Sequence, residues 1–116
     1  MHLNTYIQGN GFPILCLHGH PGSGSSMSVF TNHLSKRFLT LAPDLRGYGQ
    51  SRVKVNFDME DHLNDLEDLL DRYKIEKFML LGWSLGGILA LEVALRHPER
   101  VKGLILIATA ARPWGN

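Results

Sequence analysis

The stretch that decides the fold of this 116-residue chain is Gly82-Trp83-Ser84-Leu85-Gly86. It follows residues 77–81, which predict a strand, and precedes residues 85–96, which are apolar almost all round and predict a helix buried on several sides. The chain therefore turns from a strand directly into a helix at Ser84. Such a turn forces the residue at its apex into a strained backbone conformation.

This turn matches the G-x-S-x-G pattern of a nucleophile elbow. Gly82 and Gly86 have no side chains, which lets strand and helix approach each other. The serine oxygen is then held at the carboxyl end of the sheet, where open α/β sheets bind ligands, beside the unpaired N–H groups of a helix N-terminus. We interpret Ser84 as a nucleophile; the alternative is a glycine-rich turn with an incidental capping serine.

Strand and helix signals alternate along the whole chain, without a linker or a repeat. Strands are predicted at residues 3–7, 13–17, 38–42, 77–81 and 101–108. One helix is expected to begin after a cap at Ser25 or Ser26. Another has an apolar stripe at Met59, Leu63, Leu66, Leu69, Leu70 and Tyr73. The acidic residues of that helix are interpreted as a solvated face, with metal binding as the alternative. The order predicts an α/β fold with parallel strands.

A second loop supports the interpretation of the serine. Acyl transfer needs two N–H donors at the developing oxyanion. One is expected to be the backbone N–H of Leu85, the residue after Ser84. The other is expected from the loop His18-Gly19-His20-Pro21-Gly22, where His20 would contribute its backbone N–H rather than its imidazole.

Composition excludes several other classes of function. Twelve basic residues stand against eleven acidic ones, so nothing indicates a nucleic-acid partner. The single cysteine, Cys16, lies in an apolar run and is interpreted as a buried thiol in a reducing compartment. No stretch approaches the ~20 apolar residues of a membrane span, and the N-terminus does not resemble a signal peptide. We therefore expect a cytoplasmic protein without a membrane partner, a cofactor or a metal.

At this point the sequence resembles the α/β-hydrolase superfamily over essentially its whole length. The resemblance is carried by His18 to Gly22, by Pro43-Asp44-Leu45-Arg46-Gly47-Tyr48-Gly49-Gln50-Ser51, by Gly82 to Gly87, and by His97-Pro98-Glu99-Arg100-Val101. It implies a partial hydrolase sheet, mostly parallel with one antiparallel N-terminal strand, and helices on both faces. It also implies that residues 1–116 are the N-terminal portion of a single domain, without the cap and the C-terminal strands.

The resemblance narrows the chemistry through the residue at the elbow. Superfamily dehalogenases and epoxide hydrolases use aspartate there, whereas a serine implies hydrolysis of an ester, thioester, lactone, amide or carbon–carbon bond through an acyl-enzyme. The residues around Ser84 look most like carboxylesterase-type members, including the methyl esterase that acts on carrier-bound pimelate. Trp83 is expected either to contact substrate or to pack in the core. Asp44 is expected to be structural.

Three other functions stay open. One is a proline-aminopeptidase-like peptidase, whose relatives share the His-Gly-x-Pro-Gly loop. Another is a cofactor-free oxidase or haloperoxidase that uses the same elbow. The third is an inactive truncated fold used for binding or self-association, which would form a homo-oligomer. An intact elbow together with an intact oxyanion loop favours the hydrolase, because binding alone does not require the pair.

The family's catalytic acid and histidine have no match in these 116 residues. We therefore expect the chain by itself to have little or no activity, since a serine without its base is barely nucleophilic. The strand from Val101 to Ala108 would be an exposed apolar edge. The predicted partners are a small ester-like substrate and the remaining C-terminal part of the hydrolase, paired along that strand.

Overall fold

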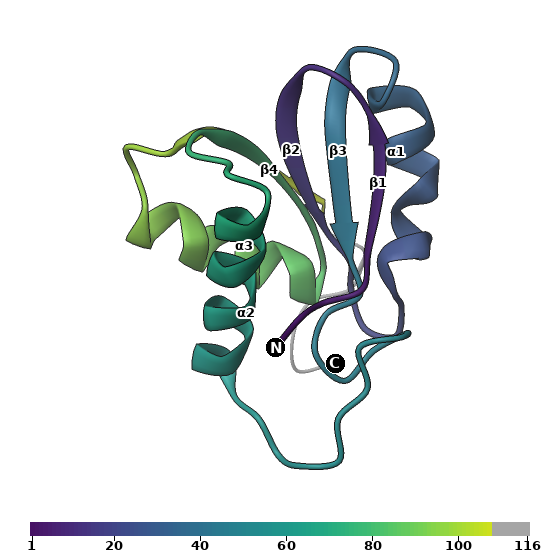
Figure 1. Ribbon diagram of the computed structural model, residues 1–116, viewed down its shortest axis with the longest axis vertical. Coiled ribbons are helices and arrows are strands. Elements are labelled where there is room, and N and C mark those ends of the chain that lie inside the picture. The colour runs from purple at the N-terminus through teal and green to yellow at the C-terminus, as the bar shows by residue number, and fades with distance from the viewer. Residues whose placement is uncertain (108–116) are drawn as a thin grey trace, which may run out of the picture.

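The computed structural model describes residues 1–107, which form a sheet with helices on both faces (Figure 1). The strands are β1 (Thr5–Gly9), β2 (Phe12–Leu17), β3 (Phe38–Pro43), β4 (Phe78–Trp83) and β5 (Val101–Ile107). Their order in the sheet is β1-β3-β2-β4-β5. Only β1, which pairs with β3, is antiparallel. The mostly parallel sheet with one antiparallel N-terminal strand is thus confirmed, although β1 begins two residues later than predicted and Ala108 lies outside the described residues.

The helices divide between the two faces of the sheet. They are a short 3-10 helix, η1 (Gly24–Met27), and the α-helices α1 (Ser28–Leu34), α2 (Met59–Arg72) and α3 (Leu85–Arg96). Helix α1 covers one face, and α2 and α3 cover the other (Figure 1). The helix predicted after Ser25 or Ser26 was misplaced at its start. The Ser23 N–H donates to Ser26 Oγ at 3.0 Å, and this bond belongs to the tight η1 turn that precedes α1.

Two apolar clusters form the core, one on each face of the sheet. Leu15, Leu17 and Leu41 pack against α2 and α3, whereas Ile14, Cys16 and Ala42 point to the α1 side. This alternation follows from the period of two in a strand. Burial raises the pKa of the Cys16 thiol to about 12, so the thiol stays protonated and unreactive at neutral pH.

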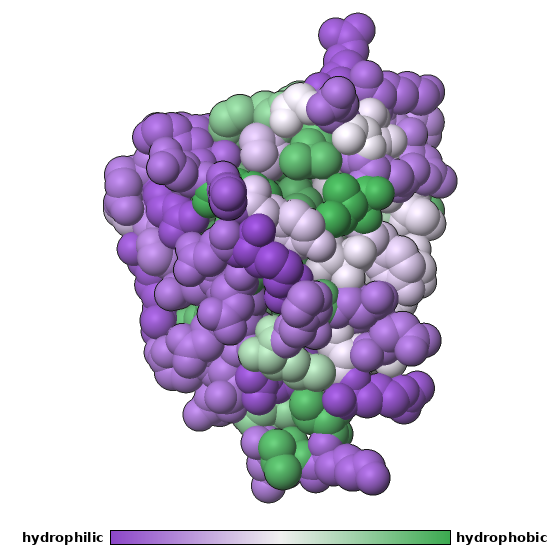
Figure 2. Space-filling view, in the orientation of Figure 1, coloured by the Kyte–Doolittle hydropathy of each residue, from purple (hydrophilic) through white to green (hydrophobic). Residues whose placement is uncertain are grey.

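Helix α2 has a polar face, but one of its acidic residues is buried. Hydrophilic residues gather on this side of the molecule in Figure 2. Asp65 was expected on the solvated face and is instead only 1% exposed. Its carboxylate accepts two hydrogen bonds from the guanidinium of Arg46, both at 2.8 Å. A buried charge needs such a partner, and Arg46 comes from a distant loop that periodicity alone does not bring to α2. Met59 and Tyr73 are exposed at the two ends of the predicted apolar stripe.

Helix α3, for which the apolar pattern predicted burial on several sides, is buried on one side only within the described residues. Gly86, Leu89, Ala90 and Val93 face the core. Ile88, Leu91 and Leu95 are 44% to 68% exposed. Leu104, Ile105 and Leu106 of β5 are also exposed, and β5 forms one edge of the sheet in the described residues. No helix within residues 1–107 is long and apolar enough to cross a membrane.

Candidate active site

Ser84 occupies the turn between β4 and α3 in a strained conformation. Its backbone angles are φ 59° and ψ −116°, and it is the N-cap residue of α3. A positive φ costs a serine of the order of 1–3 kcal/mol, so the surrounding structure must hold it. Part of that support is a hydrogen bond from the Ser84 N–H to the carbonyl of Ile107 in β5, at 3.1 Å. The side chain is exposed at the carboxyl end of the sheet, as the elbow pattern predicts.

Glycines allow the close contacts around this turn. A Cβ on Gly86 would collide with the carbonyl oxygen of Leu17 in β2, and a Cβ on Gly82 would lie 2.6 Å from the Cα of Gly87. In both cases the obstacle is backbone, which cannot rotate away. The helix can therefore pack this tightly on β2 and β4 only because these positions have no side chain.

The loop after β2 passes directly beside Ser84. A Cβ on Gly19 would lie 2.9 Å from the Cβ of Ser84 and 2.8 Å from the carbonyl oxygen of Trp83. Together these segments line an open pocket of about 240 Å³. Its lining residues are Gly19, His20, Pro21, Ser26, Trp83 and Ser84. The structure thus brings together Ser84, His20 and Trp83, three of the four residues that the sequence singled out.

The fourth residue, Leu85, is the first residue of α3 and follows Ser84 directly. The first N–H groups of a helix have no carbonyl partner within the helix, and they carry the positive end of its dipole. The N–H of Leu85 is therefore one of the donors at the positive end of α3, one residue after Ser84. An oxyanion forming on a carbonyl bound at Ser84 would meet this helix end.

Trp83 both packs in the core and lines the pocket. Its ring meets that of Phe30 edge-on at a centroid distance of 6.0 Å. Its Nε1 atom is buried and has no hydrogen-bond partner among the described residues. The two alternatives that the sequence left open for Trp83 are therefore compatible, because one face can pack on α1 while another borders the pocket.

Asp44 has the structural role that was expected of it. It is fully buried, and its carboxylate accepts hydrogen bonds from the Gly24 N–H at 2.7 Å, from the Asn4 side chain at 2.9 Å and from the Gln50 N–H at 2.8 Å. These contacts fix the loop after β3 against the N-terminal segment and η1. The Asp44 carboxylate is thus occupied by structural hydrogen bonds, and none of them joins it to Ser84.

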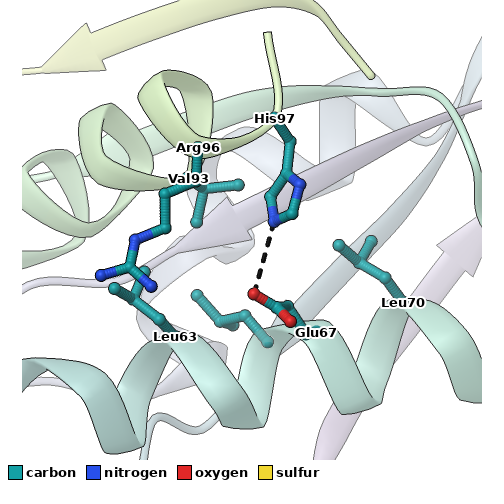
Figure 3. Close-up of a pocket in the computed structure, with 7 residues that line it drawn as sticks. Leu63, Glu67, Leu70, Val93, Arg96 and His97 are labelled. Atoms are coloured by element: carbon teal, nitrogen blue, oxygen red, sulfur yellow. Dashed lines mark hydrogen bonds and ion pairs between the residues drawn. The ribbon is translucent and has the colours of Figure 1, made fainter. Parts of the chain in front are cut away.

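No histidine in the described part of the chain hydrogen bonds to Ser84. His97, at the far end of α3, contacts Glu67 of α2 through Nε2 at 3.4 Å (Figure 3). The adjoining cavity of about 10 Å³ lies between these two helices and is too small for a substrate. His20, the only histidine in the Ser84 pocket, contacts Tyr48 instead. The remaining four are His2, His18, His33 and His62.

His18 is a buried, neutral structural residue. Its Nδ1–H donates to the carbonyl of Gly19 at 2.7 Å, and its Nε2 accepts from the Leu45 N–H at 3.0 Å. Because a carbonyl only accepts and an N–H only donates, these partners define the neutral tautomer with its proton on Nδ1. Burial lowers the pKa of His18 below its ordinary value of 6.5, and the Gly19 bond and the charge of Asp44 offset this only in part.

We expect the free energy of unfolding to fall as the pH drops below about 6.5. In that range the unfolded chain binds protons that the buried His18 resists, so protonation favours unfolding. Burial also lowers the pKa of His62, which acts in the same direction. Urea unfolding at a series of pH values between about 5 and 7 measures this slope. A His18→Gln, His62→Gln double variant should show a shallower slope than the exposed control His33→Gln. Equal slopes would contradict the expectation.

Two residues near the Ser84 pocket, Tyr48 and Ser26, were not predicted to belong to the site. Tyr48 was quoted only as part of a motif, yet its hydroxyl lies 2.8 Å from His20 Nδ1. Ser26 was considered only as a helix cap, yet it lines the pocket. The position of Tyr48 in the sequence could have indicated this contact. Tyr48 follows β3 and His20 follows β2, and the carboxyl ends of neighbouring parallel strands meet at one edge of a sheet.

Comparison with known proteins identifies the family. Residues 13–116 match the model of the alpha/beta hydrolase fold. The 2-hydroxymuconate semialdehyde hydrolase of Pseudomonas sp. (strain CF600) is 34% identical over 115 residues, covering 92% of this chain and 40% of that protein. The pimeloyl-(acyl-carrier protein) methyl ester esterase of Chromobacterium violaceum is 34% identical over 112 residues, covering 95% of this chain and 42% of that protein.

Solved structures agree with this result. A thermophilic esterase from Thermogutta terrifontis superposes with a TM-score of 0.85 at 34% identity, covering 96% of this chain and 42% of the esterase. The chain belongs to the α/β-hydrolase fold family. It spans about two-fifths of the length of these relatives.

Proposed function

We propose that this chain contributes the nucleophile of a hydrolase that cleaves ester-like bonds through an acyl-enzyme, with Ser84 as that nucleophile. The observation that carries the proposal is the position of Ser84. Its side chain is exposed in an open pocket of about 240 Å³, at the N-terminus of α3, with a strained backbone. Strain of this kind is retained where it serves a site.

In the proposed reaction, Ser84 Oγ attacks the carbonyl carbon of the substrate while its proton passes to a base. A carbon–oxygen bond forms, and the carbonyl electron pair moves to the oxygen, which the N–H groups of Leu85 and His20 stabilise. Collapse of this intermediate restores the carbonyl and breaks the bond to the alcohol, which leaves with the proton. Water then hydrolyses the acyl-enzyme by the same steps and releases the acid.

The base and its acid partner are proposed to come from sequence outside these 116 residues. None of the described histidines bonds to Ser84, and the relatives are more than twice as long as this chain. The exposed edge of β5, with Leu104 to Leu106, is the surface along which we expect the remaining hydrolase sequence to pair. The 116-residue chain alone is therefore expected to be inactive.

The proposal is tested by comparing the complete gene product that carries this sequence with the 116-residue chain. Both are assayed against p-nitrophenyl esters, a methyl ester, a proline amide and a vinylogous 1,5-diketone that reports carbon–carbon cleavage. We expect ester hydrolysis by the complete product only. Hydrolysis of the amide or the diketone alone would replace the ester assignment. No hydrolysis of any of them by the complete product would contradict the proposed function.

A further inference from the structure

Tyr48 contacts the loop that borders the Ser84 pocket. Its hydroxyl lies 2.8 Å from Nδ1 of His20. Its ring also meets the rings of His18 and His20 edge-on, at centroid distances of 5.1 Å and 5.6 Å. A phenol both donates and accepts hydrogen bonds, so this contact is available to either protonation state of the imidazole.

The loop that carries Tyr48 is itself held in place. The Tyr48 N–H donates to the carbonyl of Leu45 at 2.8 Å, and the Ser51 N–H donates to the carbonyl of Tyr48 at 2.8 Å. Asp44, fully buried, holds the Gln50 N–H of the same loop. The Tyr48 side chain therefore extends from a backbone that is fixed on both sides.

The segment from His18 to His20 is attached to this loop at two points. The buried His18 ring donates to the carbonyl of Gly19 and accepts from the Leu45 N–H, so it links its own segment to the loop after β3. His20 is exposed, and its imidazole has one hydrogen-bond partner among the described residues, the hydroxyl of Tyr48. Without that partner, an exposed side chain would sample several rotamers and would not restrain its own backbone.

We propose that Tyr48 is a positioning residue that holds His20 so that the His20 backbone N–H points at the oxyanion. The inference rests on the proposed function, because it assigns a support to one of the two N–H donors beside Ser84. Tyr48 acts through His20 and does not contact the reacting atoms.

The Tyr48→Phe variant tests this, because it removes the hydroxyl and keeps the ring contacts with both histidines. In the complete gene product, kcat for the best ester of the panel should fall about 3- to 10-fold with KM unchanged, since the bond serves the transition state only. His20→Ala should cause a similar loss, and the double variant no more than either. Tyr73→Phe, which removes a phenol hydroxyl at the end of α2, should leave kcat unchanged. An unchanged kcat in Tyr48→Phe would overturn the proposal.

A second measurement does not depend on activity. NMR relaxation of the complete gene product gives the order parameter of the His20 backbone N–H, which reports how firmly that bond is held. The order parameter should fall in Tyr48→Phe and stay the same in Tyr73→Phe. If the wild-type product hydrolyses nothing, the proposed function fails, and this order parameter alone decides whether Tyr48 holds the loop. Equal order parameters in wild type and Tyr48→Phe would overturn the anchoring by Tyr48.

Discussion

Replacing Ser84 with alanine is expected to lower kcat for ester hydrolysis by the complete gene product about 10⁶-fold. The methyl group cannot attack a carbonyl, and the N–H donors of Leu85 and His20 act on an oxyanion that no longer forms on the enzyme. Ser84 is exposed and its side chain has no hydrogen bond in the described residues, so the fold should persist. Steady-state kinetics measures the loss, and the thermal midpoint of unfolding checks the fold.

The matched control is Ser28→Ala. Ser28 is also an exposed serine at the start of a helix, but it lies in α1 and does not line the pocket. Its kcat should equal that of the wild type. Retention of more than about a hundredth of the wild-type activity in Ser84→Ala would mean that another group is the nucleophile.

Gly86→Ala is expected to destabilise the fold by about 3 kcal/mol or more, a large fraction of the ~5–15 kcal/mol that keeps a typical domain folded. The new Cβ would meet the backbone of Leu17 and the carbonyl oxygen of His18, at 2.7 Å for the latter. Both atoms belong to the end of β2 and the start of the pocket loop, so α3 and the loop would have to separate. Urea unfolding followed by circular dichroism measures the change.

Gly87→Ala is the matched control, because it adds the same methyl group one residue further along α3. Its nearest neighbour would be the carbonyl oxygen of Gly82 at 3.5 Å, an ordinary van der Waals distance. Since alanine favours a helix interior over glycine, this variant should be stabilised by about 0.5–1 kcal/mol. Equal stability of the two variants would contradict the close packing of Gly86 on β2.

The elbow and the sheet could be predicted because their signals are local. The strand–glycine–serine–glycine–helix order around Ser84 dictates a tight turn, and α3 begins and ends at the predicted residues, Leu85 and Arg96. The antiparallel β1 and the helices on both faces followed from the family resemblance and are confirmed. The family itself is confirmed by the match over residues 13–116.

The features that could not be predicted from the sequence depend mostly on contacts between residues far apart in the chain. The burial of Asp65 rests on Arg46, and the place of Tyr48 rests on its contact with His20, 28 residues away. The late start of α1 has a different cause. Ser23 is the N-cap residue of η1, and its N–H donates to Ser26 Oγ, so these serines cap the tight turn before α1 and not α1 itself.

The apolar character of α3 shows a further limit of sequence patterns. Its all-round hydrophobicity predicted burial on several sides, whereas Ile88, Leu91 and Leu95 are exposed in the described fold. An apolar pattern indicates that a helix surface is suited to burial, but it does not identify the segment that packs against that surface. The proposed remainder of the hydrolase is consistent with this exposed surface.

The most direct test of Ser84 as nucleophile is to treat the complete gene product with a fluorophosphonate and to locate the adduct by tandem mass spectrometry. A fluorophosphonate loses fluoride to an activated serine and leaves a stable phosphonyl ester on its oxygen. We expect one adduct, on Ser84, formed in step with the loss of esterase activity. Loss of activity with the adduct on another residue, or full activity with Ser84 labelled, would contradict the assignment of Ser84 as nucleophile.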